Sequence, residues 1–435
     1  MRYVIIGTGV CGMAAIEGIR SVDTTGDVTL IGDDPHGYYS RPGLAYYLTG
    51  EVPDKQLFPQ MADHFRKLRY RYVKGRVTRV SPSDHRVDLQ NGSALTYDRL
   101  LLAVGAHATP LTIPGAQLSG VLKLDHLDDA RQIMKVARRG KTAAVVGGGI
   151  TALELVEGLL ARGVKVNYLI RGDRYWSNVL DAHESKIVEQ RLKEEGVQIH
   201  YHAEVVEIQG HNRVQQVRLL DGRFLRCDMV AYAIGIQPRI ELARAAGLAV
   251  DRGVLVNQYM CSNIDNVFAA GDVAQVYDPH VGRSILDSLW TPAREQGYVA
   301  GLNMAGQQRA YVKSIPFNVT RLAGLTTTII GAVGSGRDED LVGIARGDSE
   351  TWRELPHAMM AQAGFDVNHV RLLVGEWNLL GAVVMGDQKL SLPLEKMIEN
   401  DADISGIRSQ LLSPGAPITD ILSGYWLDWR KQHTS

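Results

Sequence analysis

The chain has 435 residues, a length that corresponds to roughly two to four domains. Its formal net charge of −1 gives no bulk electrostatic reason to bind nucleic acid or an anionic membrane. No stretch approaches the roughly 18–20 consecutive apolar residues that span a bilayer, and the sequence shows no basic lead followed by an apolar run, so we expect a cytoplasmic globular protein.

The chain opens with a pattern typical of a dinucleotide-binding unit. An apolar strand at 3–6 leads into a glycine turn, a helix at 13–19 and a second strand at 28–31 that ends at two acids. In such a unit the first glycine permits the tight turn, the second lets the backbone approach a pyrophosphate, and the third lets helix and strand pack closely. The turn and the two acids, either of which can accept hydrogen bonds from a ribose diol, supply the candidate binding residues Gly7, Gly9, Val10, Cys11, Gly12, Asp33 and Asp34.

The same pattern recurs in the middle of the chain. A strand at 142–146, a glycine turn, a helix from 153 to about 162 and a strand at 164–170 follow one another in the same order. Two such units in one chain predict two different nucleotides. The candidate binding residues in this second turn are Gly147, Gly149, Ile150 and Thr151.

The second unit lacks the acid at the end of its second strand. Arg171 stands there, with Arg174 close by in sequence. An acid at this point favours the 2′-hydroxyl of NAD, whereas an arginine suits the 2′-phosphate of NADP. The pattern therefore favours NADPH over NADH; the alternative interpretation is that both arginines are solvated surface groups.

The C-terminal part follows a different pattern. Residues 370–374 and 379–385 are expected to be strands of a hairpin, and residues 393–399 and 403–412 short helices. No catalytic constellation is visible in this region.

The three cysteines, Cys11, Cys227 and Cys261, form no CxxC pair. A disulfide framework or a cysteine-ligated iron–sulfur cluster is therefore not expected. His200 and His202 alternate on an expected strand but have no partner at metal-ligand spacing, so we expect no metal site. A redox centre in this chain would then be a bound organic cofactor.

Five further segments carry a resemblance to a known family. They are Tyr38–Pro42, Leu101–Ala106, Ile113–Gly115, Ala233–Pro238 and Val267–Asp272. With the two glycine turns, they make the chain resemble the FAD-dependent pyridine nucleotide–disulfide oxidoreductase superfamily over nearly its whole length. The likeness is greatest to the branch with rubredoxin and ferredoxin reductases and the flavin part of NAD(P)H-dependent nitrite reductases. Through these segments the resemblance adds the cofactor-binding candidates Arg41, Pro42, Ala103, Gly105, Gly235, Gly271 and Asp272.

Three of the carried-over roles have simpler alternatives. The resemblance implies that Asp272 binds the ribitol chain of FAD, that Glu154 lies near the nicotinamide and the flavin, and that Trp290 lies beside the flavin where an acceptor protein docks. The alternatives are a turn-forming aspartate, an exposed acid in a first helical turn and a core tryptophan. Glu154 and Trp290 are the candidate catalytic residues.

The sequence departs from the superfamily in two ways. Cys11 stands alone within the glycine turn, and the segment 41–47 has no cysteine, so disulfide chemistry is not expected. Tyr46 lies near the position at which ferredoxin-reductase types usually have a lysine that pairs with the counterpart of Glu154.

The fold class implied by the resemblance is α/β. Two Rossmann-like, three-layer domains are expected, one inserted in the other, followed by a C-terminal α+β domain. An FAD domain would take residues 1–112 and 246–311, an NAD(P) domain residues 113–245, and the third domain residues 312–435. In some relatives the third domain forms a homodimer interface, and in others it helps to cover the flavin.

The expected function is an FAD-dependent NAD(P)H oxidoreductase. A hydride would pass from NAD(P)H to FAD, and electrons would then leave for a small redox protein (rubredoxin or ferredoxin) or a redox partner subunit. One alternative is an NAD(P)H oxidase or a small-molecule reductase related to nitrite reductases. An alternative of another class is a non-catalytic nucleotide-sensing or assembly subunit.

Overall fold

The computed structural model describes residues 1–58, 67–279, 282–333, 368–413 and 415–433. The described residues divide into two compact units. The first holds residues 1–173 and 195–313, and the second holds residues 174–194 and the chain from 314 onward. Within the described ranges no helix is long and apolar enough to cross a membrane.

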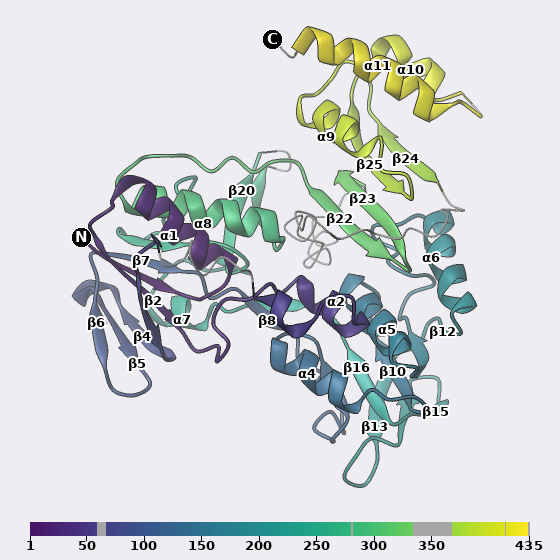
Figure 1. Cartoon of the computed structure of the whole chain (residues 1–435), viewed down its shortest axis with the longest axis horizontal. Helices are drawn as coiled ribbons and strands as arrows, with labels where there is room; N and C mark the ends of the chain where they lie inside the picture. Colours follow the sequence, from purple (N-terminus) through teal and green to yellow (C-terminus); the bar gives the residue numbers. More distant parts are fainter. Residues whose placement is uncertain (59–66, 280–281, 334–367, 414, 434–435) are drawn as a thin grey trace. The chain divides into compact units, whose positions relative to one another are not determined.

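The first unit contains two parallel five-stranded sheets with the same internal plan (Figure 1). One has the order β19-β7-β1-β2-β3, and its strands are Val267–Ala269, Arg99–Leu102, Arg2–Ile6, Asp27–Gly32 and Arg71–Lys74. The other has the order β12-β11-β10-β16-β9, and its strands are Gln198–His200, Lys165–Leu169, Thr142–Val146, Met229–Tyr232 and Val121–Lys123. In each sheet the first strand of the expected unit is central, and a helix follows it, α1 (Val10–Val22) or α5 (Ile150–Ala161).

Each parallel sheet is accompanied by a three-stranded antiparallel meander. The first meander is β4-β5-β6, formed by Val77–Ser81, Arg86–Leu89 and Ala94–Thr96. The second is β13-β14-β15, formed by Val205–Gln209, Gln216–Leu219 and Phe224–Arg226. Val87 of the first meander is fully buried in one hydrophobic core with Ile5, and Val217 of the second is fully buried with Ala144. Helix, sheet and meander make three layers, which confirms the expected fold class.

Two short strands connect these halves. β8 (Ala106–Ala108) and β17 (Ile236–Pro238) pair antiparallel, so the chain leaves the first half and returns to it through one two-stranded link. A further sheet, β18-β20-β21, is formed by Val254–Leu255, Ala274–Asp278 and Arg283–Leu286. The remaining helices of this unit are α2 (Gly43–Thr49), α4 (Leu127–Val136), α7 (Glu241–Ala245) and α8 (Trp290–Met304).

Helices α1 and α8 lie side by side with their backbones in close approach (Figure 1). A Cβ atom added to Gly297 would lie 2.2 Å from the carbonyl oxygen of Cys11, and one added to Gly301 would lie 2.1 Å from that of Ala15. These glycines in α8 allow the contact, because any side chain there would separate the helices. The contact joins the helix after the first glycine turn to a segment almost 290 residues later in the sequence.

The second unit is built on an antiparallel sheet with the order β22-β23-β25-β24. Its strands are Phe317–Leu322, Leu325–Gly331, Leu379–Met385 and His369–Val374, and its helices are α6 (Ala182–Glu194), α9 (Ser391–Glu399), α10 (Ser405–Leu411) and α11 (Ile418–His433). The expected hairpin at 370–374 and 379–385 is present, closed by a hydrogen bond from Gly375 N–H to the Asn378 carbonyl (2.8 Å). Ile330, Val384 and Leu394 are fully buried in its core.

Helix α6 packs with the C-terminal sheet, although in sequence it lies within the expected NAD(P) domain. The Nε of Arg371 on β24 donates to the buried carboxylate of Glu184 (2.8 Å), and its two terminal nitrogens donate to the carbonyls of Val333 and Val179. Glu184 and Asp181 also cap each other's backbone N–H groups at the start of α6. The expected domain boundaries stay a prediction, since compact packing alone does not decide where a functional domain ends.

Candidate functional site

The first glycine turn lies between β1 and α1, and its glycines face different surroundings. A Cβ added to Gly7 would lie 2.0 Å from the carbonyl oxygen of Ala103, and one added to Gly12 would lie 2.1 Å from that of Gly7. A Cβ added to Gly9 would meet no atom within 4 Å. Gly7 and Gly12 are thus required by the protein's own packing, whereas Gly9 borders open space, as a pyrophosphate-binding turn requires.

Helix α1 begins with free backbone donors beside that space. Its first intrahelical bond runs from the N–H of Met13 to the carbonyl of Gly9 (3.1 Å). The N–H groups of Val10, Cys11 and Gly12 therefore precede the helical ladder and are available to an anion. This gives Val10 and Cys11 a reason to belong to the candidate site that does not depend on their side chains.

The second glycine turn repeats this geometry between β10 and α5. A Cβ added to Gly147 would lie 2.2 Å from the carbonyl oxygen of Ala233, and one added to Gly148 would meet no atom within 4 Å. The first helical bond runs from Leu153 N–H to the Gly149 carbonyl (3.2 Å). The backbone donors of Ile150 and Thr151 consequently precede this ladder too.

Gly105 and Gly235 occupy matching places in the two-stranded link. Their φ angles of 66° and 117° lie in the region that favours glycine. Each carbonyl accepts a hydrogen bond from the opposite segment, Gly105 from Arg239 N–H (3.0 Å) and Gly235 from Thr109 N–H (2.9 Å). The structure thus places these two predicted residues where the chain crosses between the halves.

The second expected FAD segment comes together with the first glycine turn. β19 pairs with β7, and Gly271 follows it with a φ of 76°. A Cβ added to Gly271 would lie 3.1 Å from the Cβ of Cys11. Burial raises the pKa of the Cys11 thiol, and the nearby charge of Asp272 raises it further. Asp272 therefore lies beside the first turn, 260 residues away in sequence.

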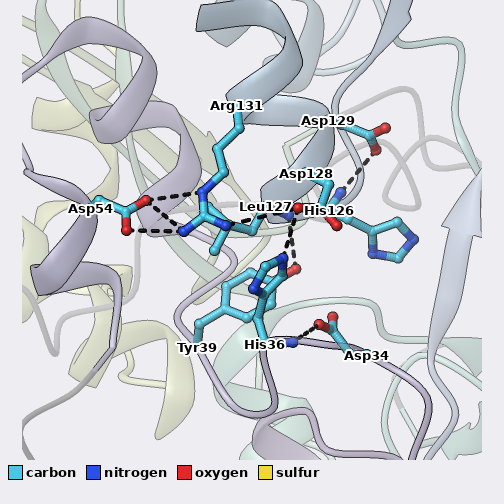
Figure 2. A network of polar contacts seen from close by, with 9 residues as sticks. All are labelled: Asp34, His36, Tyr39, Asp54, His126, Leu127, Asp128, Asp129 and Arg131. Carbon is cyan, nitrogen blue, oxygen red and sulfur yellow. Dashed lines mark hydrogen bonds and ion pairs between the residues drawn. The ribbon is translucent and has the colours of Figure 1, made fainter.

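The segment from Asp34 to Arg41 is anchored to the start of α4 (Figure 2). The Asp34 carboxylate accepts from the backbone N–H of His36 (2.9 Å), and the His36 ring lies 2.7 Å from a carboxylate oxygen of Asp128. The Tyr39 hydroxyl accepts from the N–H of Leu127 (3.1 Å). Asp33, by contrast, is exposed just past β2.

Arg41 faces a buried acid. Its guanidinium lies 4.0 Å from the carboxylate of Asp125, which is fully buried and also has Lys123 (3.5 Å) and His126 (3.3 Å) as ion-pair partners. Burial lowers the pKa of His126, and the neighbouring carboxylates oppose that shift. Sequence reasoning did not find Asp125; the only local signal is the helix start that follows it.

Figure 2 also shows the salt bridge that joins Arg131 of α4 to Asp54, with a closest distance of 3.0 Å. The Asp129 carboxylate caps the same helix by accepting from the backbone N–H groups of Asp125 and His126, at 3.0 Å each. These contacts fix the residues around Arg41 without using Arg41 itself.

Glu154 lies half-buried in the first turns of α5. The helix that carries Tyr46, α2, packs against α5, since a Cβ added to Gly158 would lie 2.6 Å from the Cβ of Leu48. Trp290 is the first residue of α8 and is half-buried. Their catalytic roles stay predictions.

The two arginines of the predicted 2′-phosphate site differ in their surroundings. Arg171 is exposed and lies two residues after the end of β11, while Arg174 is half-buried and donates to the carbonyl of Ser177 (3.1 Å). They fall in different compact units. Of the two arginines, Arg171 is the one that lies near the end of the second strand of this unit.

Gln296 was not assigned a role from the sequence. Its side-chain oxygen accepts a hydrogen bond from the N–H of Gly271 (2.9 Å), and the residue is fully buried. Among the described residues no group of three or more histidine, cysteine or acidic side chains could hold a metal ion.

The sequence model of the family described as pyridine nucleotide-disulphide oxidoreductase matches residues 1–297. A nitrite reductase [NAD(P)H] of Bacillus subtilis (strain 168) is 28% identical over 407 residues, which is 93% of this chain and 48% of that protein. The ferredoxin–NAD(+) reductase component of the biphenyl dioxygenase system of Paraburkholderia xenovorans (strain LB400) is 31% identical over 349 residues, 80% of this chain and 84% of that protein.

Among solved structures, a covalent putidaredoxin reductase–putidaredoxin complex contains a chain with a TM-score of 0.82 at 22% identity, covering 97% of this chain and 98% of that one. This likeness bears on the fold. The chain spans about half the length of two of the curated relatives it matches, the nitrite reductase and an assimilatory nitrate reductase electron transfer subunit of the same bacterium.

Proposed function

The chain belongs to the pyridine nucleotide-disulphide oxidoreductase family, and we propose that it is an FAD-dependent NAD(P)H oxidoreductase that passes electrons on to a redox partner protein. The observation that carries the proposal is the duplicated glycine turn. Each copy has one glycine packed against a carbonyl and one that borders open space, and Asp272 lies beside the first copy. Family membership and the geometry together support two dinucleotide sites.

The residues around the first turn fit FAD. Gly9 leaves room for the pyrophosphate, and the backbone donors of Val10 and Cys11 face it. Asp33 is the better acceptor for the ribose hydroxyls, because the Asp34 carboxylate already accepts from His36. Asp272, beside the first turn, would bind the ribitol chain. Bound there, FAD would accept a hydride and give up electrons singly.

The second turn would hold the nicotinamide cofactor, and we propose that it prefers NADPH. Arg171 is exposed at the end of β11, where its guanidinium can pair with a 2′-phosphate. Glu154, in the first turns of the helix after this turn, would orient the nicotinamide end. Both proposed roles are consistent with the use of FAD and NAD(P)H by this family.

Electrons would leave from the flavin without a cysteine relay. Burial raises the pKa of Cys11, Cys227 and Cys261, in the case of Cys227 to about 12, so none of the three carries the thiolate that such a relay needs. A small redox protein is the acceptor that the ferredoxin reductase relative's name supports. Homodimerisation through the C-terminal domain stays a prediction, which light scattering tests.

A partner subunit is the second candidate acceptor. The match to the nitrite reductase relative covers 93% of this chain but only 48% of that protein. The name of a second relative, an assimilatory nitrate reductase electron transfer subunit, supports a partner subunit as acceptor.

Reduction and reoxidation of the purified flavoprotein test the proposal. NADPH added without oxygen should bleach the flavin within seconds, faster than NADH, and a ferredoxin or rubredoxin should restore the colour faster than air does. A flavin that neither nucleotide bleaches would overturn the enzymatic proposal. Reoxidation by air that outpaces every protein acceptor would instead identify an oxidase.

A further inference from the structure

Lys313, Asp278 and Asp287 form a buried polar cluster. Neither the family resemblance nor the proposed function assigns a role to these three residues. Lys313 is almost fully buried, its side chain only 2% exposed, and its Nζ lies 3.1 Å from a carboxylate oxygen of Asp278 and 3.8 Å from one of Asp287. Burying an ammonium is costly unless carboxylates pair with it. The cluster is therefore a built feature of the first unit.

The two acids lie at the ends of two paired strands, β20 and β21, that are close in sequence to candidate flavin residues. Asp278 ends β20, which begins two residues after Asp272. Asp287 follows β21 and precedes Trp290 by three residues. Burial raises the pKa of Asp287, while the positive charge of Lys313 opposes the shift. Lys313 thus connects the ends of β20 and β21, the two paired strands that follow the second flavin segment.

Tyr311 and Gln296 extend the cluster toward Gly271. The Tyr311 hydroxyl is buried; burial raises its pKa, the charge of Asp287 raises it further, and the Gln296 side chain lies close enough to oppose the shift. The Oε1 of Gln296 accepts from Gly271 N–H (2.9 Å). Buried polar side chains therefore lead from Tyr311 through Gln296 to the segment that the flavin would contact.

Residues 307–313, which lead in sequence to the second unit, are held to the first unit by further hydrogen bonds. After α8, Arg309 exchanges two hydrogen bonds with the side chain of Asn303, one through its N–H (2.9 Å) and one through its carbonyl (2.8 Å). The N–H of Tyr311 donates to the carbonyl of Gln258 (2.7 Å). Lys313 is the last residue of this linker, since Ser314 begins the C-terminal part of the second unit.

We propose that Gln296, Tyr311 and Lys313 are positioning residues of the flavin site, and that they couple FAD binding at Gly271–Asp272 to the anchoring of linker residues 307–313. The inference rests on the proposed function, because it requires FAD at that segment. Coupling between two sites is reciprocal: FAD binding must stabilise the linker by the same free energy by which the anchored linker stabilises bound FAD.

Hydrogen exchange on the full chain tests the first half of this reciprocity. The apoprotein and the FAD-loaded protein are compared at peptides that cover 307–313, where Arg309 and Tyr311 have hydrogen-bonded amides. FAD should slow their exchange by roughly tenfold. Peptides from β13 to β15, in the other half of the unit, serve as the internal control and should not change.

Flavin affinity of variants tests the second half. Gln296→Leu removes the acceptor for Gly271 N–H and should raise the Kd for FAD by roughly tenfold, while Gln296→Glu keeps an acceptor oxygen and should have a smaller effect. Lys313→Arg keeps the charge and should bind FAD nearly as the wild type does. Lys313→Met removes the ammonium beside two buried carboxylates and should fold poorly, so the test relies on the two Gln296 variants.

The matched control is Lys141→Met, which removes an ion pair of 2.7 Å with Asp228 in the other half of the unit. It should leave the Kd for FAD unchanged. Linker exchange that does not respond to FAD in the wild type, or a Gln296→Leu protein that binds FAD as the wild type does, overturns the inference. A wild-type chain that binds no FAD would overturn the proposed function itself, so the two failures are distinguishable.

Discussion

The two Rossmann-like halves of the first unit are copies of one plan that differ at a few positions. Each has a packed glycine, Gly7 or Gly147, at which an added Cβ would lie only 2.0 Å or 2.2 Å from the carbonyl oxygen of Ala103 or Ala233. The second strand then ends at Asp33 in one half and at Arg171 in the other. The difference teaches that packing against the protein's own backbone fixes each turn, whereas the charge at the strand end is free to differ, and we propose that this charge selects the nucleotide.

The likeness extends to a polar contact at the base of each sheet. In the first half the Asp98 carboxylate pairs with Arg2 (2.7 Å) and accepts from its backbone N–H. In the second half Asp228 pairs with Lys141 (2.7 Å) and accepts from the N–H of Thr142. Each aspartate immediately precedes a strand that pairs with the central one. The duplicated contact shows that the shared plan includes side chains far from either nucleotide.

Substitution of the packed glycines should have the largest effect. Gly7→Ala and Gly147→Ala should each lower the free energy of unfolding by about 2–4 kcal/mol, because the new Cβ meets a carbonyl and φ is positive. Gly7→Ala should lose FAD, whereas Gly147→Ala should keep FAD and require more NAD(P)H for half-saturation. Chemical denaturation and flavin content measure both.

Gly92→Ala is the matched control, since Gly92 has a φ of 82° but open space around its Cβ position. It should cost about 1 kcal/mol, the strain of the backbone alone. Equal losses of stability for all three variants would contradict the claim that packing against Ala103 and Ala233 fixes the turns.

Substitution of Asp272 should have the next largest effect and should act on the first site only. Asp272→Ala should raise the Kd for FAD by roughly 10- to 100-fold, the range for hydrogen bonds to a charged group. The affinity for NADP⁺ should not change. Asp265→Ala, at an exposed position in the preceding loop, is the control and should bind FAD normally.

Reversal of the charge at Arg171 should exchange the nucleotide preference. Arg171→Glu should lower kcat/KM for NADPH by roughly tenfold, and NADH should be affected little, because only NADPH carries the 2′-phosphate. Steady-state reduction of an artificial acceptor measures the ratio, and Lys165→Glu at the exposed start of β11 is the charge-matched control. A ratio that is the same in wild type and Arg171→Glu would assign Arg171 to the solvated surface.

The paired aspartates should give the smallest effect, visible only in acid. Hydrogen bonds from Arg2 lower the pKa of Asp98; burial alone would raise that of Asp228, but Lys141 and the Thr142 N–H lower it more. Each ionised pair therefore contributes stability above the unfolded-state pKa of aspartate, about 3.9, and loses it as pH falls through the depressed folded value. Because both side chains are more than a third exposed, the contribution is a few tenths of a kcal/mol.

Asp98→Asn and Asp228→Asn should each make the free energy of unfolding fall less steeply below about pH 4. Their effects should be similar and additive, since they lie in separate halves. If only one variant changed the free energy of unfolding below about pH 4, the two aspartate contacts would not be equivalent.

The sequence predicted what depends on local spacing. The two turns, their helices and the hairpin at 370–374 and 379–385 follow from glycine positions and apolar periodicity. Asp272 was found only through a family resemblance, because nothing local distinguishes it from a turn former. The structure adds its position beside Cys11 of the first turn.

The features that were not predicted depend on contacts between distant segments. Lys313 is an ordinary lysine in sequence and becomes a buried ion-pair partner only when it meets Asp278 and Asp287. Asp125 is likewise one of several acids before α4 until Arg41 and Lys123 are placed beside it. Helix α6 was expected in the NAD(P) domain, and its packing with Arg371 could not be read from a local pattern.

An anaerobic titration of the wild type and the two packed-glycine variants tests the assignment of the two turns most directly. NADPH should bleach the flavin of the wild type at low concentration, and the flavin of Gly147→Ala only at much higher concentration, while dithionite reduces both alike. Gly7→Ala should contain little flavin to bleach. A Gly147→Ala protein that loses its flavin while Gly7→Ala retains it would contradict the assignment of FAD to the first turn and the nicotinamide cofactor to the second.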